Sequence, residues 1–149
     1  MNTPIQTIDD LNIILSLLNK TKERYSFSAE ITRSKKLQNL FTTYAIRRML
    51  YTAELKTLID SCGGKPNMPV RTTDALYRTW VNFKQVLIGK HDEELIDSLV
   101  AEDISLINKY NQCVQQYQHQ SGNMRLLIKH RDGIQEALNE ISATSLLVY

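Results

Sequence analysis

Three polar residues of this chain have the type and the position that metal chemistry in a helical protein requires. Glu54, Glu102 and His130 each stand within a repeat of apolar residues spaced by three and four, which predicts a place on or near the inward face of a helix. Carboxylates and imidazoles bind iron or manganese, and several must converge to offset the removal of water from the ion. These three residues are therefore the metal-ligand candidates, with Glu23 or Glu30 to fill in the set.

The candidate set lacks parts of the usual motif. Di-metal sites in four-helix bundles take a Glu from each of two helices and a Glu-x-x-His from each of the other two. Thr57 follows Glu54 where the motif has His, Leu127 precedes His130 where the motif has Glu, and no Glu-x-x-His occurs in the chain. The sequence therefore does not predict a complete di-metal centre.

Ion pairing is the alternative interpretation of the same residues. Glu54 can pair with an arginine, one of Glu102 and Asp103 can pair inward while the other faces outward, and His130 can serve as an interhelical hydrogen-bonding residue. The arginines that could form these ion pairs are Arg47, Arg48 and Arg131. Side chains that converge at positions 26, 54, 102 and 130 would favour a metal, whereas an arginine inserted among them would favour a salt-bridged core, which we expect.

Motifs for covalent or phosphate chemistry are absent from the sequence. There is no Gly-x-Ser-x-Gly, no His-Glu-x-x-His and no glycine-rich loop before a helix. Gly63 and Gly64 follow a predicted helix and are interpreted as its C-terminal stop. Cys62 and Cys113 have no Cys-x-x-Cys spacing and are expected to be buried, unreactive thiols. These motifs alone do not decide whether the chain is an enzyme.

The composition excludes several classes of partner. The chain has 149 residues, of which 42% are hydrophobic and 23% charged, and its net charge of +2 is spread without a basic or acidic block. We therefore expect no nucleic-acid partner. The N-terminus lacks a basic signal-peptide region, and no apolar stretch approaches the roughly 18 residues of a membrane helix, so we expect a cytoplasmic protein without a membrane partner.

The elements that must position these residues are long helices. Only five Gly and three Pro occur, and they gather at a few joints, which predicts an all-α fold in one domain spanning 1–149. The apolar spacing predicts helices at about 7–31, 34–62, 91–118 and 123–142, with a short helix at 74–88. About 28 residues separate the second and third long helices, enough for a crossover that makes these two helices parallel, as in ferritin-like bundles.

Several short runs also carry a resemblance to a known family. They are Ala53-Glu54-Leu55, Cys62-Gly63-Gly64-Lys65-Pro66, Tyr77-Arg78-Thr79-Trp80, Leu87-Ile88-Gly89-Lys90, Ala101-Glu102-Asp103 and His130-Arg131-Asp132-Gly133-Ile134. Over about residues 8–141 the chain resembles a bacterial family of ferritin-like four-helix-bundle proteins, a domain of unknown function related to rubrerythrins and ferritins. Glu54, Glu102 and His130 match that family by position, whereas Ser26 stands where the family has a Glu.

The family has no assigned reaction, and the residues together with the resemblance leave two functional hypotheses. The first is a ferritin-like bundle protein without a complete di-metal centre, associated with stress, which acts through self-association or a partner. The apolar tail from Leu146 to Tyr149 and the crossover helix predict a homodimer. The alternative is a di-iron or di-manganese oxidase or peroxide-handling protein of the rubrerythrin type, which would use iron or manganese as its cofactor.

Overall fold

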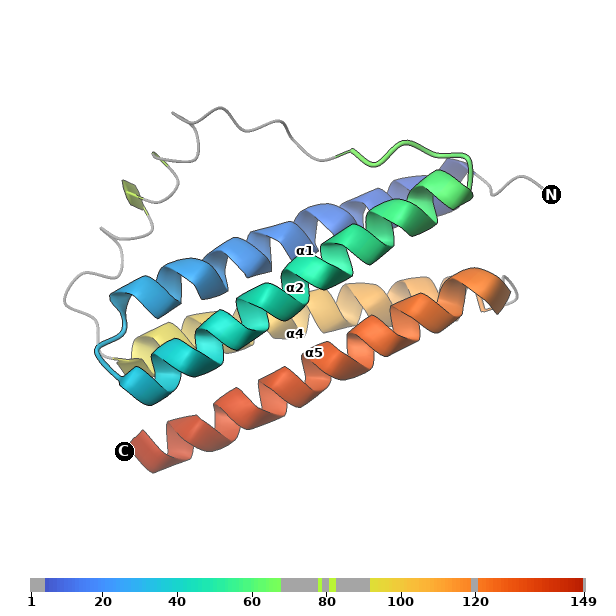
Figure 1. Cartoon of the computed structure of the whole chain (residues 1–149). Helices are drawn as coiled ribbons and strands as arrows, with labels where there is room; N and C mark the ends of the chain where they lie inside the picture. Colours follow the sequence, from blue (N-terminus) through green and yellow to red (C-terminus); the bar gives the residue numbers. More distant parts are fainter. Residues whose placement is uncertain (1–4, 68–77, 79–80, 83–91, 119–120, 149) are drawn as a thin grey trace.

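The computed structural model describes residues 5–67, 78, 81–82, 92–118 and 121–148, and within these it is an all-α bundle of four long helices (Figure 1). The helices are α1 (Ile5–Ile31), α2 (Lys35–Ser61), α4 (Asp92–Gln116) and α5 (Ser121–Val148). The predicted all-α fold is confirmed. The largest error is at the end of α5, which continues to Val148 instead of ending at 142, since no Gly or Pro follows Gly133 to stop it.

Local signals in the sequence explain both ends of α2. Ser34 caps its N-terminus, and the Ser34 hydroxyl accepts a hydrogen bond from the backbone N–H of Leu37. Gly63 has a positive φ of 85°, and the N–H groups of Gly63 and Gly64 donate to carbonyls of the last helical turn. The predicted glycine stop is therefore confirmed.

Polar contacts between helices establish their directions. The hydroxyl of Thr32, after the end of α1, donates to Asp92 at the start of α4, and Tyr117, just after α4, donates to Asp10 near the start of α1. Because α1 is thus antiparallel to α4 and also to α2, the helices α2 and α4 run in the same direction (Figure 1). The predicted short helix at 74–88 falls almost entirely outside the described residues.

The described core consists of two large apolar clusters, with a polar layer between them along the helices, and a small third cluster at Leu95. One cluster is built around Leu15, Leu55 and Tyr110, and the other around Phe41 and Ile96. The buried polar residues on α1, α2 and α4 that lie between the two clusters in sequence are Asn19, Thr21, Arg48, Thr52 and Asp103. The interior of the bundle is therefore apolar toward both ends and polar in its middle.

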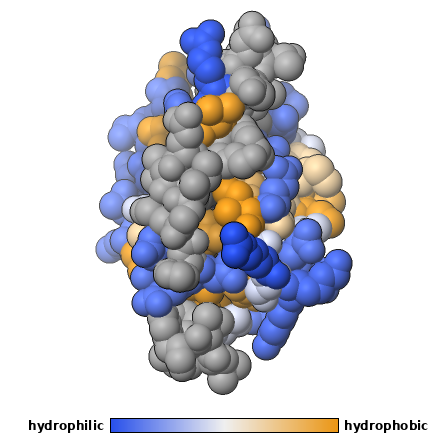
Figure 2. Space-filling model, turned by 90° about the vertical axis from the view of Figure 1, so that its left-hand side faces the viewer, coloured by the Kyte–Doolittle hydropathy of each residue, from blue (hydrophilic) through white to orange (hydrophobic). Residues whose placement is uncertain are grey.

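Hydrophilic residues cover most of the described surface at the end of the bundle that holds the α1–α2 turn, and hydrophobic ones show between them (Figure 2). Within the described residues no helix has the length and apolarity needed to cross a membrane.

Candidate functional site

A buried ion pair occupies the polar layer. Arg48 of α2 donates two hydrogen bonds to Asp103 of α4, from Nη1 to Oδ1 at 2.8 Å and from Nη2 to Oδ2 at 2.9 Å. Each residue is only 1% exposed. The planar guanidinium matches a carboxylate in this two-point arrangement, which offsets part of the cost of burying both charges.

Tyr25 adds a third helix to this cluster. The phenol of Tyr25, on α1, donates to Oδ2 of Asp103 at 2.5 Å, and the guanidinium carbon of Arg48 lies 4.7 Å from the centre of the Tyr25 ring. Burial, together with the neighbouring Asp103 charge, raises the pKa of Tyr25 well above its usual value, so the phenol stays protonated and donates. Burial alone would lower the pKa of Arg48, but the hydrogen bonds to Asp103, the charge of Asp103 and the nearby Tyr25 and Tyr110 together outweigh burial and raise that pKa. We call Tyr25, Arg48 and Asp103 the central triad.

A second polar pair joins α2 to α5. Nε2 of His130 lies 3.3 Å from Oε1 of Glu54, and Nζ of Lys129 lies 3.3 Å from Oε2 of the same carboxylate. His130 is fully buried, and burial lowers its pKa despite the neighbouring Glu54. Burial would raise the pKa of Glu54, but its bonds to Lys129 and His130 lower it overall. Nδ1 of His130 has no hydrogen-bond partner among the described residues.

The His130 ring is held in place by an aromatic stack. The Tyr51 ring lies nearly parallel to the His130 ring, with 4.3 Å between their centres. Gly133 makes room for this ring, because a Cβ at that position would lie 2.1 Å from the Tyr51 oxygen. The glycine therefore serves close helix packing in the middle of α5.

The structure brings together two of the three metal-ligand candidates. Glu54 and His130 are adjacent, but Glu102 pairs with Arg24 at 3.4 Å, across the α1–α4 contact. The other carboxylates and Ser26 are placed elsewhere: Glu23 accepts a hydrogen bond from Asn19, and Ser26 and Glu30 line a groove between α1 and α2.

The metal-ligand candidates that the structure describes do not gather into one set. Among the described residues no group of three or more His, Cys, Asp or Glu side chains is arranged to hold a metal ion. The inward carboxylate of α4 is Asp103, and both of its oxygens already accept hydrogen bonds from the permanently charged Arg48. A cation in the middle of the bundle opposes the binding of a second one.

Of the three candidate arginines, Arg48 is buried in the core, and the residue that it pairs with is Asp103 instead of Glu54. The spacing of buried residues on α2, at 41, 44, 48, 52 and 55, is a signal that places Arg48 inward. Nothing comparable in the sequence indicates that Tyr25 bonds to Asp103. The thiols differ from each other: Cys113 is buried as predicted, whereas Cys62 is only half-buried.

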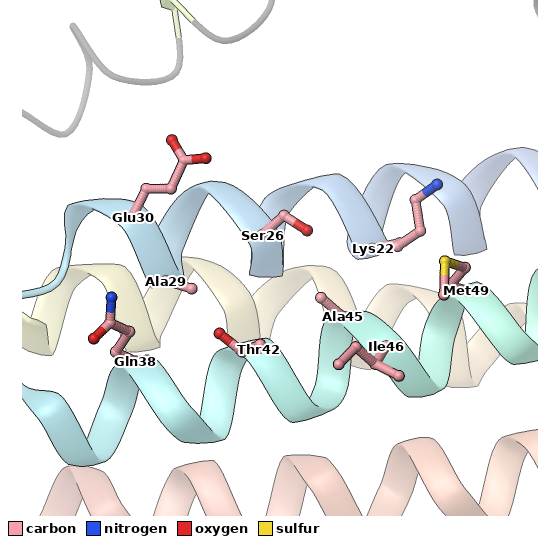
Figure 3. A pocket seen from close by; sticks show the side chains of 9 residues that line it. All are labelled: Lys22, Ser26, Ala29, Glu30, Gln38, Thr42, Ala45, Ile46 and Met49. Carbon is pink, nitrogen blue, oxygen red and sulfur yellow. The ribbon is translucent and has the colours of Figure 1, made fainter.

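Two surface features accompany the polar sites. An open groove of about 500 Å³ lies between α1 and α2, with the short side chains of Ala29, Thr42 and Ala45 between the two helices (Figure 3). On the same helix Ile46 and Met49, which line the groove, and Leu50, which lies beside it, are exposed at 51%, 53% and 55%.

The chain matches the model of a known protein family. Residues 6–116, which include α1, α2 and α4, match the family described as Domain of unknown function (DUF2383). No curated protein matches the chain. The family description assigns no activity and makes no link to ferritins, rubrerythrins or a stress response. The chain, with its salt-bridged bundle centre, therefore belongs to the DUF2383 family of unknown function.

Proposed function

We propose that this protein is a ferritin-like helical bundle that lacks a di-metal centre and acts by self-association. The observation that carries this proposal is the central triad, in which Arg48 occupies both oxygens of Asp103 in the middle of the bundle. A guanidinium cannot lose its charge in a protein, so it repels a metal ion at all physiological pH values. In this proposal the interior stabilises the fold, and the surface carries the function.

The exposed apolar residues of α2 support the second half of the proposal. Met49 and Leu50 are both neighbours of Ile46 on the helix surface, since they follow it by three and four residues. Contiguous apolar patches on a folded protein are typical of surfaces that contact another chain. Ile104, on α4, has no other exposed large apolar residue three or four positions away on its own helix.

Metal loading tests the first half. The purified full chain is incubated anaerobically with excess Fe(II) or Mn(II), desalted, and its metal content measured. We expect below about 0.2 metal ions per chain, because Glu54 and His130 alone offer too few ligands. About one or two ions per chain, lost in the variant His130→Ala and kept in a surface control such as Asp132→Asn, would overturn this half and favour the metal-dependent oxidase.

Sedimentation velocity over a range of protein concentrations tests the second half. We expect the average mass to rise from that of one chain to that of two as the concentration increases. A single species of one-chain mass at every concentration, up to several hundred micromolar, would overturn self-association.

A further inference from the structure

The residues along one face of α2 are ordered so that the face is complementary to an antiparallel copy of itself. The α2 outer face consists of exposed residues at helical spacing, namely Lys35, Gln38, Asn39, Thr42, Ile46, Met49, Leu50, Ala53, Thr57 and Asp60. From its N-terminal end the face is basic, then polar, then apolar in the middle, then polar, then acidic. Laid against a reversed copy of itself, the face sets its apolar middle on the apolar middle of the copy and its basic end on the acidic end.

The charges at its ends are unfavourable for α2 alone. Lys35 stands in the first turn, where the helix dipole favours acids, and Asp60 stands in the last turn, where it favours bases. The first turn of α2 has no acidic residue, and the last turn has no basic residue. In an antiparallel pair of α2 helices, each Lys35 would lie beside Asp60 and the negative end of the other α2.

From this arrangement, and resting on the self-association proposed above, we propose that two copies of the chain associate through their α2 outer faces in antiparallel orientation. The twofold axis passes the face at the level between residues 47 and 48. The numbers of any two residues that face each other across the contact therefore add up to 95. Lys35 then faces Asp60 of the second copy, Thr42 faces Ala53, and Ile46 faces Met49. The same surface thus serves on both chains, as a closed twofold dimer requires.

A charged side chain in the apolar middle is the first test. Leu50→Asp in the full chain should weaken the dimer at least about tenfold in sedimentation equilibrium, because it places two carboxylates in the apolar centre of the contact. The matched control is Ile104→Asp, on α4, whose side chain is similarly exposed at 47% but lies off this face. The control should dissociate like the parent chain. Equal dissociation constants for both variants would overturn the proposed face while leaving self-association intact.

Charge reversal then tests the orientation. Lys35→Glu and Asp60→Lys should each weaken the dimer by about fivefold, since each variant creates two like-charge contacts, and the double variant should restore it. Each single reversal also corrects a charge that opposes the dipole of its own helix, so it should not lower the thermal stability of the monomer. The proposed orientation would be overturned if a single variant weakened the dimer only by destabilising the monomer. It would also be overturned if the double variant weakened the dimer by the sum of the two single effects.

Chemical cross-linking provides an independent check of the register. In a Cys62→Ser background, chains with Thr42→Cys are mixed with chains with Ala53→Cys and treated with a short bis-maleimide. We expect the mixture to give the cross-linked dimer and each variant alone to give much less. Efficient linking of Thr42→Cys chains to each other would indicate a parallel pair and overturn the proposal.

Discussion

The central triad and the Glu54–His130 pair are both polar contacts between helices, but they are satisfied to different degrees. Asp103 accepts from two nitrogens of Arg48 and from Tyr25, and all three side chains are buried. His130 is also buried, yet it has one longer contact, to a half-exposed Glu54, and its Nδ1 has no partner among the described residues. The triad is therefore a fixed structural element, whereas the pair is one whose charge state can change.

The two sites also differ in whether water can replace a charge partner that is removed. A buried charge that loses its partner has no water to replace it, so the cost of separation is large. At Glu54 solvent reaches the carboxylate, and a lost partner is replaced by water at little cost. The effect of a substitution should therefore depend on which of the two sites it touches more than on the type of residue removed.

The largest effect is expected at Arg48. Arg48→Ala leaves the carboxylate of Asp103 buried without its countercharge, which should lower the free energy of unfolding by about 3–5 kcal/mol in urea denaturation. The double variant Arg48→Met, Asp103→Leu removes both charges and should recover most of that loss, because apolar residues of similar size pack well in such positions. A double variant as unstable as Arg48→Ala would mean that the triad contributes more than charge compensation.

The next effect concerns the aromatic stack on His130. Gly133→Ala places a Cβ where the Tyr51 hydroxyl lies, so the ring must shift away from His130. Alanine is the better helix former by about 1 kcal/mol, and we expect the displaced contact to outweigh this, for a net loss of about 1 kcal/mol. Tyr51→Phe removes the atom in closest approach, so the same Gly133→Ala change should cost less in that background. An equal loss in both backgrounds would show that the stack is not what constrains position 133.

The sequence predicts the bundle well and the central triad only in part. Helical spacing and glycine stops are local properties, and they place α2 and its C-terminal end correctly. The inward position of Arg48 also follows from spacing. Its pairing with Asp103, 55 residues away, depends on how far α2 and α4 are shifted along each other, which is set by the packing of the whole core. For the same reason the contact between Gly133 and Tyr51 has no signal in the sequence.

A smaller effect is expected from acidification at the Glu54–His130 pair. The pKa of His130 is lowered by burial below its usual value near 6.5, so the unfolded chain binds more protons than the folded one. The free energy of unfolding should therefore fall as the pH drops below about 6.5, until the pKa of the folded state is reached. His130→Phe, which keeps an aromatic ring against Tyr51, should lose that part of the slope between about pH 6.5 and 5. Urea denaturation at each pH and at one fixed protein concentration measures the slope. Parallel curves for the two proteins would mean that His130 does not contribute.

The smallest effect is expected at Lys129. Comparing it with the effect at Arg48 tests directly whether burial distinguishes the two sites. Its ammonium group is as close to a carboxylate as His130 is, but the side chain is 66% exposed, and water replaces it when it is removed. Lys129→Ala should therefore change the free energy of unfolding by less than about 0.5 kcal/mol, with a further decrease of the effect at high salt. The comparison with Arg48→Ala holds the chemistry constant, since both variants take a cation from a carboxylate. If the loss at Lys129 approached that at Arg48, burial would not be the property that distinguishes the two sites.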